Sequence, residues 1–177
     1  MLCAIAKLDD TATGRLDALR RAASPAGGPL RPLYGHITLA SFLEADEEEL
    51  LRACRARLGS ERAFSLGYEK LEVLGETSIL VASPGPSEAL RALRGRLVEG
   101  FEERLDPWTA EARWRPHTTL LFGPGLDLDR ICRRLSRDFA PFPARVQRVE
   151  LSRVLAEGYE ILARFELRGG ADEEVRR

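Results

Sequence analysis

The sequence has no excess of charge of either sign, since 27 Lys and Arg side chains nearly balance 28 Asp and Glu side chains and leave a net charge of −1. A protein that wraps long duplex nucleic acid needs a clear basic excess to contact many phosphates, so this class is excluded. A small nucleotide or an RNA end remains compatible with the balance. The chain also lacks an apolar run long enough to span a bilayer, so we expect no membrane partner.

Cysteine is scarce as well. Cys3, Cys54 and Cys132 are an odd number at unrelated spacings, and they form neither a disulfide framework nor a zinc-binding pattern. Cys54 and Cys132 fall on apolar helical faces, which indicates buried thiols. We therefore expect a reduced, cytoplasmic protein. A chain of 177 residues suits one domain and is long enough to bury a substantial core. We also expect a monomer.

Histidine is rarer still, and both copies stand in the same short pattern. Residues 36–39 read His-Ile-Thr-Leu and residues 117–120 read His-Thr-Thr-Leu. Side chains of an extended strand alternate between its two faces, so His36 and Thr38 share one face, as do His117 and Thr119. An imidazole beside a hydroxyl, present twice, suggests a site with two proton-transfer groups and two hydroxyl donors.

The two copies are 81 residues apart, and the similarity extends well beyond them. Residues 36–82 and 117–163 share eleven identities in 47 ungapped positions, where average composition gives roughly four. Sequence rich in alanine and leucine aligns easily with itself, but the least replaceable residues are among the matches. We interpret residues 1–168 as one two-lobed domain built on this internal repeat, and residues 169–177 as a disordered tail.

Hydrophobic periodicity predicts alternating strands and helices. The predicted strands cover residues 2–8, 35–43, 63–74, 77–83, 115–122, 142–155 and 159–168. The predicted helices cover residues 11–23, a segment opening on the acidic run 46–49, a long segment from 86 to about 105, and residues 127–139. Each motif strand comes directly before a helix. The fold class is therefore α+β, with two small antiparallel sheets around a central cleft and helices outside.

These features resemble the 2H phosphoesterase superfamily, which is named for two His-x-Thr/Ser motifs in a duplicated α+β fold. Its members include 2′-5′ RNA ligase-like proteins and cyclic nucleotide phosphodiesterases. The resemblance runs from the first strand to about residue 168, and it implies metal-independent chemistry, without a cofactor, on 2′,3′-cyclic phosphate ends of RNA or related small nucleotides. Gly35 is a departure, because many members carry proline before the first histidine.

The chemistry of such a site follows from the residue types. Opening a cyclic phosphodiester needs a base that takes a proton from water and an acid that protonates the departing sugar oxygen. Two imidazoles that titrate near neutrality, His36 and His117, can do both. The hydroxyls of Thr38 and Thr119 can bind the phosphate and stabilise the charge that gathers on its oxygens. The sequence does not say which histidine is the acid.

Strand alternation adds three further substrate-binding candidates. Tyr34 and Phe42 share the face of His36 if that strand stays extended, and Arg115 shares the face of His117. An aromatic ring could stack on a base, and the Arg115 guanidinium could pair with phosphate. The alternatives are that Phe42 is a core residue and that Tyr34 and Arg115 lie at the rim.

Other features have simpler explanations. The two histidines have no third ligand at a usable spacing, so we expect no metal site. A basic stripe on the predicted helix over 127–139 is better explained as a solvated face than as an RNA-guiding surface. A protein that binds nucleotides or RNA ends in the same cleft without turning them over would also carry both motifs, and it remains the alternative to an enzyme.

Overall fold

Seven strands form one hydrogen-bonded sheet in the computed structural model, which describes residues 1–24, 35–75 and 77–169. The strands are, in chain order, β1 (Leu2–Leu8), β2 (His36–Phe42), β3 (Phe64–Val73), β4 (Ile79–Pro84), β5 (Thr118–Phe122), β6 (Phe142–Leu155) and β7 (Gly158–Glu166). Neighbouring strands pair antiparallel in the order β2-β1-β6-β3-β4-β5, and β7 also pairs with β6. The strands β2 and β5, which belong to the two motifs, are the two ends of this order.

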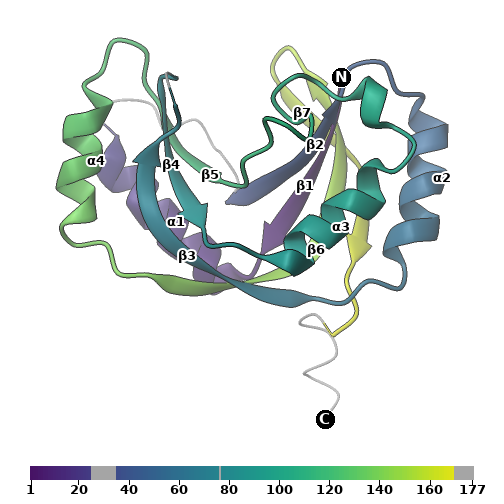
Figure 1. Ribbon diagram of the computed structural model, residues 1–177, viewed down its shortest axis with the longest axis horizontal. Helices are drawn as coiled ribbons and strands as arrows, with labels where there is room; N and C mark the ends of the chain where they lie inside the picture. The colour runs from purple at the N-terminus through teal and green to yellow at the C-terminus, as the bar shows by residue number, and fades with distance from the viewer. Residues whose placement is uncertain (25–34, 76, 170–177) are drawn as a thin grey trace.

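The long strand β6 joins the two expected sheets into one. Its first part, Phe142–Val146, pairs with β3, and its later residues lie between β1 and β7. The sheet bends along β6, so that β3, β4 and β5 form one wall and β1, β2 and β7 the other (Figure 1). The predicted α+β class is confirmed. The two expected sheets are two halves of one sheet, which β6 connects.

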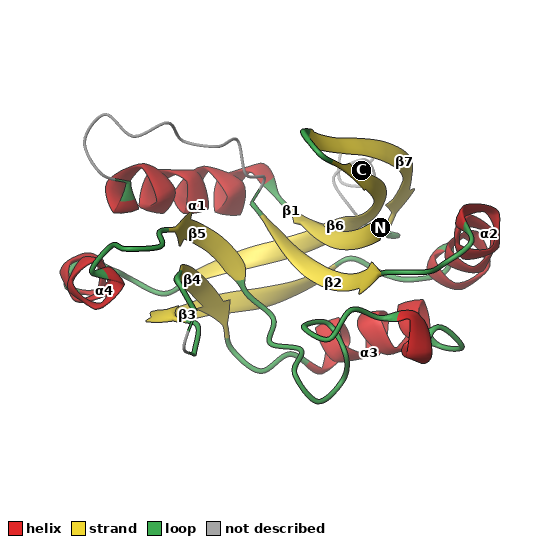
Figure 2. Cartoon of the chain, turned by 90° about the horizontal axis from the view of Figure 1, so that it is seen from above, coloured by secondary structure: helices red, strands yellow, loops and turns green. Residues whose placement is uncertain are grey.

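Four α-helices cover the outer side of this bent sheet in the described residues (Figure 2). They are α1 (Asp10–Ala23), α2 (Glu47–Leu58), α3 (Glu88–Val98) and α4 (Leu128–Ser136), and a 3₁₀ turn, η1, covers Glu102–Arg104. Helices α1 and α4 pack together beside β3, β4 and β5, whereas α2 and α3 pack together beside β2 and β7. Leu16, Leu50 and Leu93 are among the helix side chains that the core buries almost completely.

Side chains cap the starts of the helices, as the acidic residues before them predict. Asp46 accepts a hydrogen bond from the Glu49 amide at the start of α2, and Asp127 does the same for Arg130 in α4. Asp9 accepts from the Ala12 amide in the same way at the start of α1, which begins one residue before the predicted range 11–23.

Helix α3 is shorter than predicted. The apolar stripe suggested a helix to about residue 105, but α3 ends at Val98 and the chain turns at Gly100, whose φ is +76°. This backbone conformation strains residues that carry a Cβ atom. Phe101, which follows this turn, is still buried in the core at 4% exposure. The apolar pattern therefore continues although the helix does not.

The order of elements matches in the two halves of the chain. β2, α2, β3 and β4 follow one another as β5, α4, β6 and β7 do. This order is what the predicted internal repeat requires, and the duplication itself stays a prediction. The tail from residue 170 lies outside the described residues. Within the described part of the chain, no helix is both long and apolar enough to cross a membrane.

Candidate active site

The first motif lies on β2, at one end of the sheet. His36 and Thr38 are half-buried, whereas Ile37 and Leu39 are fully buried at 0% exposure. Strand alternation places the imidazole and the hydroxyl on one face and the apolar side chains on the other, and the burial of each side chain fits this arrangement. The motif therefore anchors itself in the core through its second and fourth residues and presents its first and third residues outward.

The second motif repeats this arrangement at the other end of the sheet. His117 comes directly before β5, and it is half-buried, as is Thr119. Thr118 and Leu120 are buried, at 1% and 2% exposure. The same two positions of the motif thus point into the protein in both halves.

Both motif strands carry a β-bulge directly after the threonine. In β2 the pairing with β1 skips Leu39, and in β5 the pairing with β4 skips Leu120. One extra residue reverses the alternation of faces along the rest of a strand, and bulges concentrate at sheet edges and beside functional sites. The two leucines of the motifs occupy equivalent bulges, a shared feature that the sequence pattern does not reveal.

The bulge in β2 explains why the prediction for Phe42 is wrong. Phe42 pairs with Leu2, not with a residue on the His36 face, and it is buried at 0% exposure. Its ring packs edge-on against Phe101, with the centroids 5.9 Å apart. Phe42 is therefore a core residue, the alternative noted from the sequence, because the extra residue turns its side chain to the core face.

The two motifs lie side by side although they stand at opposite ends of the strand order. The Thr118 hydroxyl donates a hydrogen bond to the main-chain oxygen of His36, at 2.9 Å. The indole Nε1–H of Trp114 donates to the main-chain oxygen of Thr38, also at 2.9 Å. The bend in the sheet therefore brings its two outer strands together, and side-chain hydrogen bonds connect them.

A hydrogen bond within the second motif orients the His117 ring. Its Nδ1 lies 2.7 Å from the main-chain oxygen of Arg115, which can only accept, so Nδ1 carries the hydrogen and Nε2 is the free nitrogen of the neutral ring. Burial lowers the pKa of His117 below its ordinary value, since it disfavours the charged ring. The hydrogen bond to Arg115 and the negative charge of Glu72 act in the opposite direction without outweighing burial.

Glu72 is a neighbour of this site that sequence reasoning missed. Its carboxylate, on β3, accepts hydrogen bonds from the Ser83 hydroxyl at 2.6 Å and the Lys70 ammonium at 2.8 Å. Burial acts to raise the pKa of Glu72, but these hydrogen bonds and the charges of Lys70 and His117 lower it on balance. Glu72 is therefore ionised near neutral pH. No signal in the sequence marks it, because its link to His117 depends on how distant strands pair.

Comparison with known proteins identifies the family of the chain. The sequence profile of the 2′-5′ RNA ligase superfamily matches residues 8–157, most of the chain. The chain belongs to the 2′-5′ RNA ligase superfamily. This membership confirms the resemblance to 2H phosphoesterases and supports an enzyme of the phosphoesterase or ligase type.

Solved structures share the fold of this superfamily member. TT0787 of Thermus thermophilus is similar with a TM-score of 0.68 at 23% identity, over 95% of this chain and 98% of that one. LigT of E. coli, complexed with 3′-AMP, is similar with a TM-score of 0.63 at 19% identity, over 94% and 96%. A search of curated proteins finds no significant match. At these identities the structural likeness concerns the fold.

The remaining predicted ligand residues have different outcomes. Arg115 is exposed and lies outside β5, so strand alternation does not set its direction; its guanidinium donates to the main-chain oxygen of Trp114 at 3.2 Å. Pairing of Arg115 with phosphate stays a prediction. Tyr34 lies outside the described residues.

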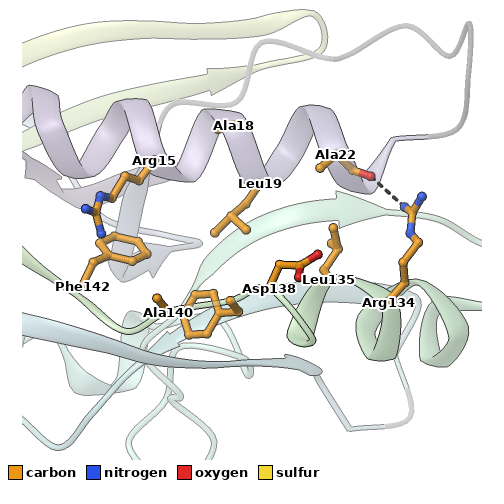
Figure 3. A pocket seen from close by; sticks show the side chains of 10 residues that line it. Arg15, Ala18, Leu19, Ala22, Arg134, Leu135, Asp138, Ala140 and Phe142 are labelled. Carbon is orange, nitrogen blue, oxygen red and sulfur yellow. Dashed lines mark hydrogen bonds between the residues drawn. The ribbon is translucent and has the colours of Figure 1, made fainter.

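Within residues 1–24, 35–75 and 77–169, no three or more His, Cys, Asp and Glu side chains gather in a way that could hold a metal ion. A cavity of about 640 Å³ lies between α1 and α4 (Figure 3) and is lined mainly by apolar side chains such as Leu19, Leu135 and Phe142. His36, Thr38, His117 and Thr119 do not line it, so this cavity is separate from the two motifs.

Proposed function

We propose that the protein is a metal-independent phosphoesterase that acts on 2′,3′-cyclic phosphate or 2′-5′-linked nucleotides or RNA ends by two-histidine general acid–base catalysis. The observation that carries the proposal is the contact between the motifs. One half-buried His-x-Thr pair lies on β2 and the other at the start of β5, at the two ends of the strand order, and the Thr118–His36 hydrogen bond connects them. Membership of the 2′-5′ RNA ligase superfamily supports the same reaction class.

The environment of His117 favours its role as the base. Burial keeps the ring neutral near pH 7, and the Arg115 oxygen reserves Nδ1 for a hydrogen, which leaves Nε2 free to accept a proton. In the proposed hydrolysis, Nε2 takes a proton from the attacking water while a new P–O bond forms. His36 gives a proton to the sugar oxygen as the ring P–O bond breaks. The product is a phosphomonoester beside a free hydroxyl.

Thr38 and Thr119 are proposed to bind the reacting phosphate. Both side chains are half-buried beside their histidines, so a ligand can reach them without displacing the core. Hydroxyl donors aimed at the non-bridging oxygens would stabilise the charge that develops during the reaction. The exposed Arg115 guanidinium would add a charge-assisted contact to the same phosphate.

Small nucleotides are the proposed substrates because of their charge and size. LigT, which shares the fold, is known in complexes with 3′-AMP, phosphate and ATP. The net charge of −1 is compatible with binding a short, highly charged end and not with wrapping a long duplex. We propose that the protein works as a monomer in the cytoplasm.

A substrate panel with chelator present tests the proposal. The panel contains cyclic mononucleotides, oligonucleotides ending in a 2′,3′-cyclic phosphate and 2′-5′-linked dinucleotides, and EDTA is present throughout. We expect turnover of at least one class at an undiminished rate. Strict dependence on an added divalent ion would contradict the mechanism. Tight nucleotide binding without turnover would instead favour a binding module that uses the same residues.

A further inference from the structure

The second half of the chain holds the main chain of the first motif at two points. Among the described strands β2 pairs only with β1, and on its other side an isolated bridge joins Phe42 to Leu105 at its far end. The carbonyl groups near the start of β2 therefore need partners from elsewhere. Thr118 donates to the oxygen of His36, and Trp114 donates to the oxygen of Thr38. Both donors are side chains of the segment that leads into and forms the second motif. Hydrogen bonds to the main-chain oxygens of His36 and Thr38 thus connect the first motif to the segment that contains the second motif.

Thr118 is the closer of these two points to the chemistry. It stands between His117 and Thr119, and only 1% of it is exposed. A threonine hydroxyl has one hydrogen, which Thr118 gives to His36, so the Tyr68 hydroxyl, 2.5 Å from the same oxygen, must donate its own hydrogen to Thr118. Tyr68 is buried at 0% exposure. A buried chain of two hydroxyl groups therefore ends on the backbone of His36.

Trp114, which donates the second hydrogen bond to the first motif, is itself packed against a buried arginine. It is 7% exposed, and the guanidinium of Arg94 lies over its ring, 4.7 Å from the ring centroid. Arg94 is itself buried at 2% exposure and donates through Nε to the main-chain oxygen of Leu39. The backbone of three of the four residues in the first motif therefore accepts hydrogen bonds from buried side chains of other elements.

We propose that Thr118 is a positioning residue, which sets the separation of His36 and His117 through its hydrogen bond to the His36 backbone. The inference rests on the proposed function, since both imidazoles must act on one phosphate. Displacing a reacting group by about 1 Å can cost on the order of 100-fold in rate. A lost attachment at His36 would move one imidazole relative to the other without removing either. The second position of the motif is Ile37 in the first copy and Thr118 in the second, so only the second copy has a hydroxyl there.

Four variants separate positioning from stability. Thr118→Val removes the donor to His36 and leaves the Tyr68 hydroxyl without an acceptor, so we expect kcat to fall by about 10-fold to 100-fold, with KM little changed, and Tm to fall. Thr118→Ser keeps the hydroxyl and should retain most of kcat. Tyr68→Phe leaves the Thr118–His36 bond in place and should also retain kcat. The double variant Thr118→Val/Tyr68→Phe has no stranded tyrosine hydroxyl, so part of the Tm should return while kcat stays low.

The outcomes distinguish this inference from the proposed function. An active parent whose Thr118→Val variant keeps full kcat overturns the inference alone. A Tyr68→Phe variant as slow as Thr118→Val, or a double variant that regains both Tm and kcat, also overturns it, because the effect would then follow packing and not the bond to His36. A parent inactive on the whole panel overturns the proposed function, and the inference with it.

Discussion

Burial and the neighbouring groups shift the pKa of His117 in opposite directions. Burial favours the neutral ring, whereas the Arg115 oxygen and the Glu72 carboxylate favour the charged ring. Burial is the stronger influence, so His117 should take up a proton only below the ordinary pKa of histidine, about 6.5. A proposed base needs this balance, because it must be neutral at the working pH.

Glu72→Gln should shift this balance in a known direction. Removing the carboxylate charge removes an influence that favours the imidazolium, so the pKa of His117 should fall further. The acidic limb of the pH–kcat profile should move to lower pH with it. Imidazole NMR titration measures the change directly, since the chain has two histidines to resolve. Glu48→Gln, which removes the same charge from the exposed face of α2, is the control. A rise in the His117 pKa in Glu72→Gln would refute this account of the site.

Substitution of the motif threonines tests what their hydroxyls do. If they stabilise charge that develops during reaction, Thr38→Val or Thr119→Val should lower kcat by on the order of 100-fold and weaken substrate binding much less. Steady-state kinetics on the best panel substrate provide both quantities. Thr11→Val, at an exposed position of α1, serves as the control. An increase in KM with kcat unchanged would show that the hydroxyls only hold the ground state.

At the level of elements, local patterns predict most helices and strands but not the details that depend on pairing. The acidic residues before α2 and α4 mark both helix starts, because capping is a short-range effect. The bulges at Leu39 and Leu120 depend on which residues of β1 and β4 lie opposite, and no local pattern carries that information. The bulge at Leu39 is also the reason why strand alternation predicted the wrong face of the sheet for Phe42.

The end of α3 offers a matched pair of glycine substitutions. Gly100 has a φ of +76°, so Gly100→Ala should lower the free energy of unfolding by about 1–2 kcal/mol. Gly95 is an exposed residue inside α3 with open space where a Cβ atom would lie, so Gly95→Ala should raise it by about 1 kcal/mol. Denaturant unfolding of the two variants gives both values. Equal effects of the same sign would contradict the explanation of where the helix ends.

At the scale of the whole molecule, the site depends on a sheet that bends until its outer strands meet. The 14 residues of β6 connect both walls, and the Thr118–His36 hydrogen bond closes the arrangement between β5 and β2. Because the His-x-Thr motif occurs twice, the sequence alone indicates that His36 and Thr38 act together with His117 and Thr119. The hydrogen bond between Tyr68 and Thr118 and the electrostatic interaction between Glu72 and His117 join segments far apart in the chain, so they could be found only in the folded structure.

The most direct test of the account is a double-mutant cycle on the two histidines, measured with chelator present on the best substrate of the panel. His36→Ala and His117→Ala should each lower kcat by on the order of 100-fold to 10,000-fold. The double variant should be little slower than either single variant, because an acid and a base that act on one phosphate work as a unit. Single variants that keep most of the activity, or losses that simply multiply in the double variant, would contradict the claim that the two motifs form one catalytic site.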